Sequence, residues 1–186
     1  MFSRQTLLGS DYELLNRTNG LPNPDYWGAV LWHKLVGRRV YGMTPGIGCD
    51  ATCQFDLRFH CVDDFSGDGV VVIVVNFNLV NSYNITIGNM PLPAASAMTQ
   101  NGSTIARSSP SQQVLQYRLS GQPGSNHIFF NDKPLLYSLA AVPVLAPASV
   151  AAGSELNVPP ASVTFFRFQA AASAHFPVAD ADVAAA

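Results

Sequence analysis

Apolar residues recur along most of this chain with the short periods that are typical of β-strands. From Gln54 to Cys61 the residues alternate, with Phe55, Leu57 and Phe59 on one face, which predicts a half-buried strand. The apolar run from Val70 to Leu79 predicts a buried central strand. Four further strands are predicted, at residues 83–88, 113–119, 127–131 and 163–168. Several short strands separated by glycine and proline turns predict a mostly β chain that folds as a β-sandwich.

A second period, close to that of an α-helix, marks one segment near the start of the chain. Asn23 suits an N-cap, Pro24 suits the first helical position, and Gly37 suits a left-handed C-cap. The residues between them place one apolar face at helical spacing, formed by Trp27, Val30, Leu31 and Leu35. The pattern therefore predicts a helix over residues 24–36.

The chain is predicted to divide into two parts and a tail. Thr6-Leu7-Leu8 predicts a short strand, and a loop follows it up to Asn23. This strand-loop-helix unit occupies residues 1–39, and the β-sandwich occupies residues 40–169. Residues 170–186 are rich in alanine and predict a disordered tail. Since one strand and one helix cannot bury a core of their own, the first part is expected to need partners that the chain does not supply.

Composition and charge exclude several functional classes. The chain has 186 residues, of which 48% are hydrophobic and 12% are charged, as in a folded protein with a core. The formal net charge is -2 and no basic stripe is present, so nucleic acid is not an expected partner. The run from Val70 to Val75 is too short to cross a bilayer, so no transmembrane segment is expected. Residue 1 does not open a signal-peptide pattern, so any secretory signal is expected upstream.

Three cysteines, Cys49, Cys53 and Cys61, lie within thirteen residues. A disulfide among them, reduced structural cysteines, and a zinc cluster that includes His60 are the alternatives. Adjacent residues of a strand point to opposite faces, so the pair His60 and Cys61 argues against zinc. No metal and no cofactor is therefore expected.

Other residues with possible chemistry are scattered along the chain. N-glycosylation sequons begin at Asn16, Asn84 and Asn101 and are compatible with an extracytoplasmic route. A solvated acidic turn is expected, rather than a calcium site, at Asp63, Asp64 and Asp68. Surface or strand positions are expected for the four histidines, His33, His60, His127 and His175. No Gly-x-Ser-x-Gly motif and no phosphate-binding loop is present.

Two motifs at the start of the chain carry a resemblance to a known family. The run from Asn23 to Gly37, which reads NPDYWGAVLWHKLVG, follows shortly after the segment RQTLLGSDY that ends at Tyr12. Together they resemble the end of the catalytic barrel in the heparanase-like proteins of glycoside hydrolase family 79, and are similar above all to the plant members. Looser matches continue in the same order at residues 58–61, 75–78, 128–135 and 162–166.

The resemblance implies a (β/α)8 barrel with an attached β-sandwich. This chain would supply the last barrel strand, its active-site loop and the last barrel helix, followed by the sandwich. The resemblance also implies that Tyr12 helps to bind the uronic acid sugar at the cleavage site. A phenol suits that role, because it donates a hydrogen bond to a carboxylate or hydroxyl while its ring packs on the sugar.

The chain departs from the family in two respects. Family members retain anomeric configuration with two glutamates, an acid/base and a nucleophile. This chain has only Glu13 and Glu155, which match neither catalytic position and are both expected to be solvated. Cys61 matches a family cysteine that usually pairs near the C-terminus, but no cysteine follows it here.

Two functional hypotheses from different classes follow. The first is the C-terminal part of a retaining hydrolase that cleaves β-glucuronide bonds, inactive alone, with no catalytic residue of its own. Its partners would be a glucuronic-acid-containing carbohydrate or glucuronide and the upstream barrel portion of the same protein. Its location would be extracellular or in the secretory pathway, either free or peripheral on a membrane. The alternative is a non-catalytic β-sandwich module that binds glycan or protein.

Overall fold

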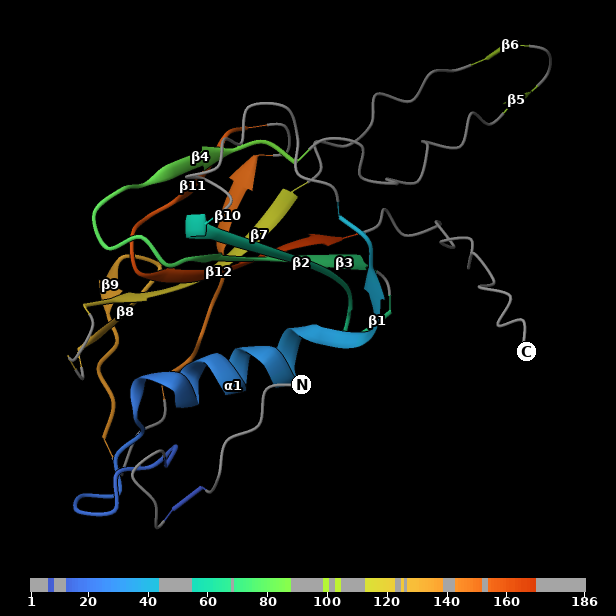
Figure 1. Cartoon of the computed structure of the whole chain (residues 1–186). Coiled ribbons are helices and arrows are strands. Elements are labelled where there is room, and N and C mark those ends of the chain that lie inside the picture. The colour runs from blue at the N-terminus through green and yellow to red at the C-terminus, as the bar shows by residue number, and fades with distance from the viewer. Residues whose placement is uncertain are drawn as a thin grey trace, which may run out of the picture.

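The computed structural model describes residues 7–8, 13–43, 55–67, 69–87, 99–100, 103–104, 113–122, 125, 127–138, 143–151 and 154–169. This part of the chain is mostly β, and helix α1 (Pro24–Leu35) precedes the strands (Figure 1). The strands are β1 (Val36–Tyr41), β2 (Leu57–Asp64), β3 (Gly69–Asn76), β4 (Tyr83–Ile85), β5 (Thr99–Gln100), β6 (Ser103–Thr104), β7 (Gln113–Gly121), β8 (Ile128–Phe130), β9 (Lys133–Pro134), β10 (Ala148–Ala151), β11 (Leu156–Val158) and β12 (Ser162–Gln169).

One large antiparallel sheet organises the described residues. Its strand order is β1-β2-β3-β12-β7-β8-β9, and β10 also pairs with β7. The central strands β3 and β12 pair over their whole lengths, from Gly69 opposite Gln169 to Asn76 opposite Ser162. Two short pairs lie outside this sheet, β11 with β4 and β5 with β6. The last strand in sequence therefore lies at the centre of the sheet, so the sheet cannot be complete until the chain has reached residue 169.

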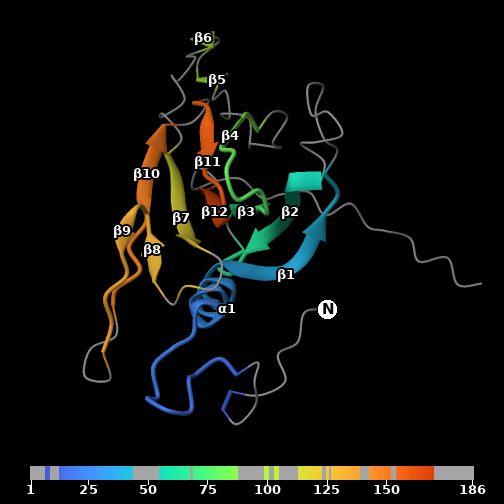
Figure 2. The same ribbon diagram turned by 60° about the vertical axis from the view of Figure 1, so that its left-hand side comes forward.

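Both faces of the large sheet are covered by other elements of the chain. On one face α1 packs against the sheet in a cluster that includes Trp27, Leu31, Val71, Ile73 and Phe165. On the other face β11 and β4 pack against it in a cluster that includes Val72, Val74, Val158 and Phe166. Figure 2 shows α1 on one side of the sheet and the β4–β11 pair on the other. The described residues thus form three layers, with a core on each side of the sheet.

The valine-rich run of β3 is explained by these two cores. Successive side chains of a strand point to opposite faces, and both faces of β3 are covered. Val71 and Ile73 face the helix, whereas Val70, Val72 and Val74 face the β4–β11 pair. A strand buried on both faces needs apolar residues at every position, and the predicted buried central strand is confirmed here.

Helix α1 is confirmed, but its ends differ from the prediction. Asn23 is the N-cap residue with extended backbone geometry, and Pro24 follows it as the first helical residue. The Asn23 side chain, however, does not cap the helix. Gly37 is not a left-handed C-cap, because Val36 ends the helix in extended conformation and Gly37 lies in β1. A Cβ at Gly37 would overlap the Asp63 carboxyl and the Asp64 carbonyl. The glycine is needed there for close approach of β1 to β2, and not for a left-handed turn.

The sequence pattern predicted six of the described strands and missed the others. The segments predicted around residues 54–61, 70–79, 83–88, 113–119, 127–131 and 163–168 correspond to β2, β3, β4, β7, β8 and β12. The first is shifted, because Phe55 lies in a helical turn and is 75% exposed, while β2 runs on to Asp64. The pattern missed β1, β5, β6, β9, β10 and β11, because β1 has the polar sequence VGRRVY and the others are only two to four residues long.

Residues 7 and 8, the described part of the strand predicted at residues 6–8, do not form a strand. Leu7 and Leu8 form a bend and are about half exposed, at 55% and 51%. The Leu7 carbonyl accepts a hydrogen bond from the Leu15 N–H at 3.0 Å. A barrel strand takes its ladder from neighbouring strands, and the described residues supply Leu7 and Leu8 with none.

Helix α1 also packs more extensively against other elements of this chain than expected. Trp27, Leu31 and Leu35 are buried against the chain's own sheet. The Lys34 Nζ donates to the Leu145 carbonyl at 3.3 Å, so the helix is also tied to the segment before β10. Strand β1 crosses the predicted boundary at residue 39. The division into residues 1–39 and 40–169 stays a prediction, and the predicted tail at 170–186 lies outside the described residues.

Candidate functional site

The predicted sugar-contacting residue, Tyr12, lies outside the described residues, and the next described segment begins at residue 13. Residues 13–23 form a closed loop between that position and α1. Within it the Asn16 N–H donates to the Leu21 carbonyl at 2.8 Å, and the Asn23 N–H donates to the Leu14 carbonyl at 2.8 Å. Gly20 turns the chain with a φ of 70°, a value that glycine adopts without strain. The loop is thus closed by its own backbone hydrogen bonds.

Glu13 is buried, at 7% exposure, so the prediction of a solvated glutamate is wrong for this residue. Its Oε1 accepts a hydrogen bond from the Arg17 N–H four residues later. Its carbonyl oxygen accepts a hydrogen bond from the Asn23 Nδ2 at 2.8 Å. The asparagine that suits an N-cap thus holds the first residue of the loop instead. Glu13 belongs to the framework of the loop.

The loop is also fastened to the sheet side of the molecule. The Tyr137 hydroxyl donates a hydrogen bond to the Pro22 carbonyl at 2.9 Å. The Tyr137 ring lies 5.2 Å from the Trp27 ring, centroid to centroid. Trp27 in turn meets Tyr26 edge to face at 5.3 Å. Three segments that are distant in sequence therefore meet here: the loop, the start of α1 and the chain after β9.

The two glutamates of the chain do not approach each other. Glu155 is exposed, as predicted, and its Oε2 accepts a hydrogen bond from the Asn84 Nδ2 at 3.3 Å. Glu155 directly precedes β11, and β11 lies at the opposite end of the molecule from the loop that contains Glu13 (Figures 1 and 2). A glycosidase needs its two carboxyl groups on either side of one glycosidic bond. Glu13 and Glu155 cannot act as such a pair.

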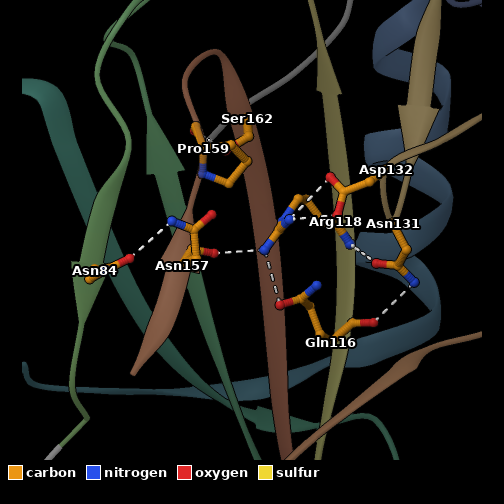
Figure 3. A network of polar contacts seen from close by, with 8 residues as sticks. All are labelled: Asn84, Gln116, Arg118, Asn131, Asp132, Asn157, Pro159 and Ser162. Carbon is orange, nitrogen blue, oxygen red and sulfur yellow. Dashed lines mark hydrogen bonds and ion pairs between the residues drawn. The ribbon is translucent and has the colours of Figure 1, made fainter. Parts of the chain in front are cut away.

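A buried arginine that the sequence interpretation did not single out is the centre of a polar network (Figure 3). Arg118 lies on β7, and its Nη1 contacts the two Asp132 carboxylate oxygens at 3.1 and 3.0 Å. Its Nη2 donates to the Gln116 Oε1 at 3.2 Å and to the Asn157 carbonyl at 2.7 Å. The Asn157 Nδ2 donates to the Asn84 Oδ1 at 2.9 Å, which extends the network to β4. The network joins the large sheet to the β4–β11 pair.

The hairpin between β8 and β9 supplies the carboxylate of this network. Asn131 and Asp132 have φ values of 46° and 65°, the left-handed conformation that Asn and Asp tolerate in tight turns. The Asn131 Oδ1 accepts a hydrogen bond from the Arg118 N–H at 3.0 Å. In the sequence, the Asn131-Asp132 pair between two apolar runs is the signal from which this turn could have been predicted. Because the Arg118 guanidinium is buried and already paired, it is not free to bind an anionic sugar.

The acidic turn also differs from its prediction, because Asp64 is not solvated. Its side chain is 1% exposed and pairs with Arg167, whose Nη2 lies 2.7 Å from the Asp64 Oδ2. Burial by itself raises the pKa of the Asp64 carboxyl. Hydrogen bonds from Arg167 and Ser66, together with the Arg167 charge, outweigh burial and lower this pKa below its ordinary value. Asp68 lies outside the described residues.

The structure tests the alternatives for the three cysteines only in part. Cys61 is buried in the cluster between the sheet and the β4–β11 pair, and its thiol is free. Burial raises the pKa of this thiol, so it stays protonated at neutral pH. Cys49 and Cys53 lie outside the described residues, so a disulfide between these two stays a prediction.

The structure describes most of the predicted histidine and sequon positions. His33, His60 and His127 are exposed, as expected, whereas His175 lies outside the described residues. Among the sequon residues, Asn84 is exposed on β4 and Asn16 is half-buried, while Asn101 lies outside the described part of the chain. No group of three or more metal-ligating side chains occurs among the described residues. Within those same residues, no helix has the length and apolar character that a membrane span requires.

Comparison with curated proteins confirms the resemblance seen in the sequence. The chain is 29% identical to Heparanase-like protein 1 of Arabidopsis thaliana over 182 residues, which cover 89% of this chain and 32% of that protein. It is 25% identical to Heparanase-like protein 2 of the same plant, over 89% of this chain and 33% of that protein. It is 36% identical to the Baicalin-beta-D-glucuronidase of Scutellaria baicalensis over 86 residues, 46% of this chain and 15% of that enzyme.

The chain therefore spans about a third of the length of the heparanase-like proteins that it matches. No family model matches the chain. Among solved structures, an alpha-L-arabinofuranosidase from Thermotoga maritima matches with a TM-score of 0.34 and 12% identity, over 61% of this chain and 19% of that one. A TM-score this low supports no conclusion about the fold.

Proposed function

We propose that this chain is the C-terminal part of a retaining glycoside hydrolase that cleaves β-glucuronide bonds. The observation that carries the proposal is the similarity to heparanase-like proteins over 89% of the chain. The similarity to a baicalin β-glucuronidase supports a glucuronide, or a glucuronic-acid-containing carbohydrate, as the substrate. No cofactor is required, because glycoside hydrolysis by this route uses only carboxyl groups and water.

In this proposal the chain contributes substrate binding and structural support for the barrel, and the catalytic residues lie in another part of the same protein. Tyr12 contacts the uronic acid sugar, and the loop at residues 13–23 carries Tyr12 to its place. The upstream portion of the same protein supplies the barrel and both catalytic glutamates.

The proposal includes a secretory route. Three sequons support it, and Asn84 is the best placed of the described acceptors, because it is exposed on β4. The protein would then act outside the cytoplasm, either free or peripheral on a membrane.

The experiment that tests this function is a turnover assay on the purified 186-residue chain. With 4-nitrophenyl β-D-glucuronide we expect no release of nitrophenol above the buffer rate, because Glu13 is engaged in its loop and Glu155 lies at the other end of the molecule. A complete β-glucuronidase at equal concentration serves as the positive control. Turnover by the chain that survives repurification would contradict the proposal, since it would require catalytic groups within these residues.

One observation favours the alternative of a non-catalytic β-sandwich module that binds glycan or protein. Helix α1 packs on the chain's own sheet, so the described residues have a core on both faces of that sheet. A module with its own core folds without an upstream barrel. A transcript that begins just before Met1 would favour this alternative.

A further inference from the structure

Four large apolar side chains are exposed at one end of the large sheet. Strands β2 and β3 are antiparallel neighbours, and Leu57 at the start of β2 lies opposite Asn76 at the end of β3. The segment before β2 and the segment after β3 therefore meet at the same end, where the Phe77 N–H donates to the Asp56 carbonyl at 2.8 Å. Their exposed apolar side chains, which we call the apolar tip, are Phe55 (75% exposed), Phe77 (60%), Leu79 (62%) and Val80 (82%).

Asparagine side chains hold the apolar tip in its shape. Asn76 is 1% exposed, and its Nδ2 donates to the Asn81 carbonyl at 2.9 Å and to the Pro159 carbonyl at 2.8 Å. Its Oδ1 accepts a hydrogen bond from the Asn78 N–H at 2.9 Å. The Asn78 Oδ1 in turn accepts hydrogen bonds from the Val80 and Asn81 N–H groups at 2.8 and 2.7 Å. A turn that is fixed by a buried polar side chain presents its apolar residues to solvent, so their exposure is built into the fold.

The charged groups beside the apolar tip nearly balance. Arg58 is exposed, and its guanidinium carbon lies 6.0 Å from the Phe77 ring centroid. The Asp56 carboxylate accepts hydrogen bonds from the Tyr83 hydroxyl and the Asn78 Nδ2, which hold its pKa below the ordinary value. With one cation and one anion, this surface recognises a partner mainly by apolar character. An arginine beside it also suits a phosphate layer, because its stem lies along apolar surface while its charged head stays in water.

The size of the apolar tip favours a lipid surface over another protein. Two phenylalanine and two aliphatic side chains at these exposures offer on the order of 500 Å² of apolar area. A stable protein interface takes roughly 800 Å² from each partner. A bilayer has no fixed shape to match, so side chains on two neighbouring turns can enter it without a complementary pocket and still gain the transfer free energy of their apolar area.

We propose that the apolar tip is a membrane-contacting surface, whose side chains insert into the headgroup layer of a phospholipid bilayer. The inference rests on the proposed function for its location, because a protein that is peripheral on a membrane outside the cytoplasm needs a surface that attaches it. Attachment by one small apolar patch is weak and reversible, as it is for a single acyl chain.

The inference is tested by flotation of the purified 186-residue chain with vesicles of phosphatidylcholine and a minority of phosphatidylglycerol. We expect the chain to float with the vesicles, and Phe77→Ser to lower its partition coefficient by at least about tenfold, because the apolar area of the ring is lost. Val80→Ser should lower the coefficient by about threefold or more. Raising the salt concentration should change binding by less than about threefold, since the charges beside the tip nearly balance.

Phe65→Ser is the matched control, because Phe65 is 67% exposed but follows β2, whereas Phe55 precedes it. The length of β2 separates these two phenylalanines by about 27 Å. This variant should float like the unmodified chain. All the replaced side chains are exposed, so the midpoint of urea unfolding should stay the same in every variant, which shows that each is folded.

A chain that does not float, or an equal loss of binding in Phe65→Ser and Phe77→Ser, would overturn the inference. A dimer in solution that Phe77→Ser dissociates would also overturn it, because the apolar tip would then be an interface between two copies. Failure to float leaves the proposed hydrolase function in place. A transcript that starts just before Met1 would remove that function and leave the flotation result as it stands.

Discussion

Replacing Trp27 with alanine is expected to lower the free energy of unfolding by about 3–5 kcal/mol, the usual cost of removing a large buried aromatic side chain. Trp27 is 2% exposed and lies where α1 meets both the sheet and Tyr137. Its removal leaves a cavity under the helix and frees one side of the Tyr137 ring. Urea unfolding followed by circular dichroism measures the change.

The same helix supplies the control, since Trp32 lies five residues later and is 51% exposed. Trp32→Ala is expected to change the free energy of unfolding by no more than about 0.5 kcal/mol, as for most exposed positions. Equal losses in the two variants would contradict the packing of α1 on the sheet described above.

Replacing Arg167 with methionine is expected to destabilise the chain by about 3–5 kcal/mol at pH 7, because it leaves the buried Asp64 carboxylate without its counter-charge. The Asp64 side chain is 1% exposed, and Ser66 remains as a hydrogen-bond donor to it. The variant keeps an unbranched side chain but removes the guanidinium, so the charge and its hydrogen bonds to Asp64 and Ser66 are lost together. Chemical unfolding at a series of pH values provides the measurement.

The pH dependence of this variant has the opposite sign to that of the unmodified chain. In the unmodified chain the pKa of Asp64 is lowered on folding, so the stability it contributes is present above the unfolded pKa of about 3.9 and is lost as pH falls through the folded pKa. Without Arg167, burial is the largest influence left on the Asp64 carboxyl, opposed only by hydrogen bonds from Ser66 and Gly67, and we expect it to raise the folded pKa above the unfolded value. The variant then recovers stability as pH falls and the carboxyl is protonated.

The difference between the two chains should therefore narrow from pH 7 toward pH 4. Arg58→Met is a suitable control, because Arg58 is exposed and stacks on Phe77, with its guanidinium carbon 6.0 Å from the ring centroid. It should cost about 1 kcal/mol or less. A loss in Arg167→Met that is the same at pH 7 and pH 4 would contradict the account of a buried charge.

The parts of the fold that were predictable are those governed by local pattern. The apolar run at residues 70–75 predicts β3, because a strand covered on both faces needs no polar position. Pro24 and the spacing of Trp27 and Leu31 predict α1, because helix start signals and period lie within one segment. These features depend on residues that are near each other in the sequence.

The features that were missed depend on partners far apart in the chain. Asp64 looks like a solvated turn residue until Arg167, 103 residues later, is placed beside it. Gly37 looks like a helix cap until β2 lies against it. Strand β10 has a weak strand sequence and forms because β8 pairs with only the end of β7 and leaves residues 113–116 of β7 for β10 to pair with. No periodicity carries this information, since tertiary pairing creates it.

The candidate site shows the same division. Tyr12 is predicted by resemblance alone and lies outside the described residues. Glu13 was expected to be solvated, because its burial depends on a loop closure that brings the Arg17 N–H and Asn23 to it. The hydrogen bond from Tyr137 to the Pro22 carbonyl has no signal in the sequence, since the two residues are 115 positions apart.

The central claim, that this chain is the C-terminal part of a β-glucuronide hydrolase, is tested most directly by determining the 5′ end of the full-length transcript. The account predicts an in-frame upstream segment that encodes a signal peptide and a barrel with two glutamates at the ends of its strands. A transcript that starts just before Met1 would contradict it, because the chain would then lack a barrel, both catalytic carboxyl groups and a secretory signal.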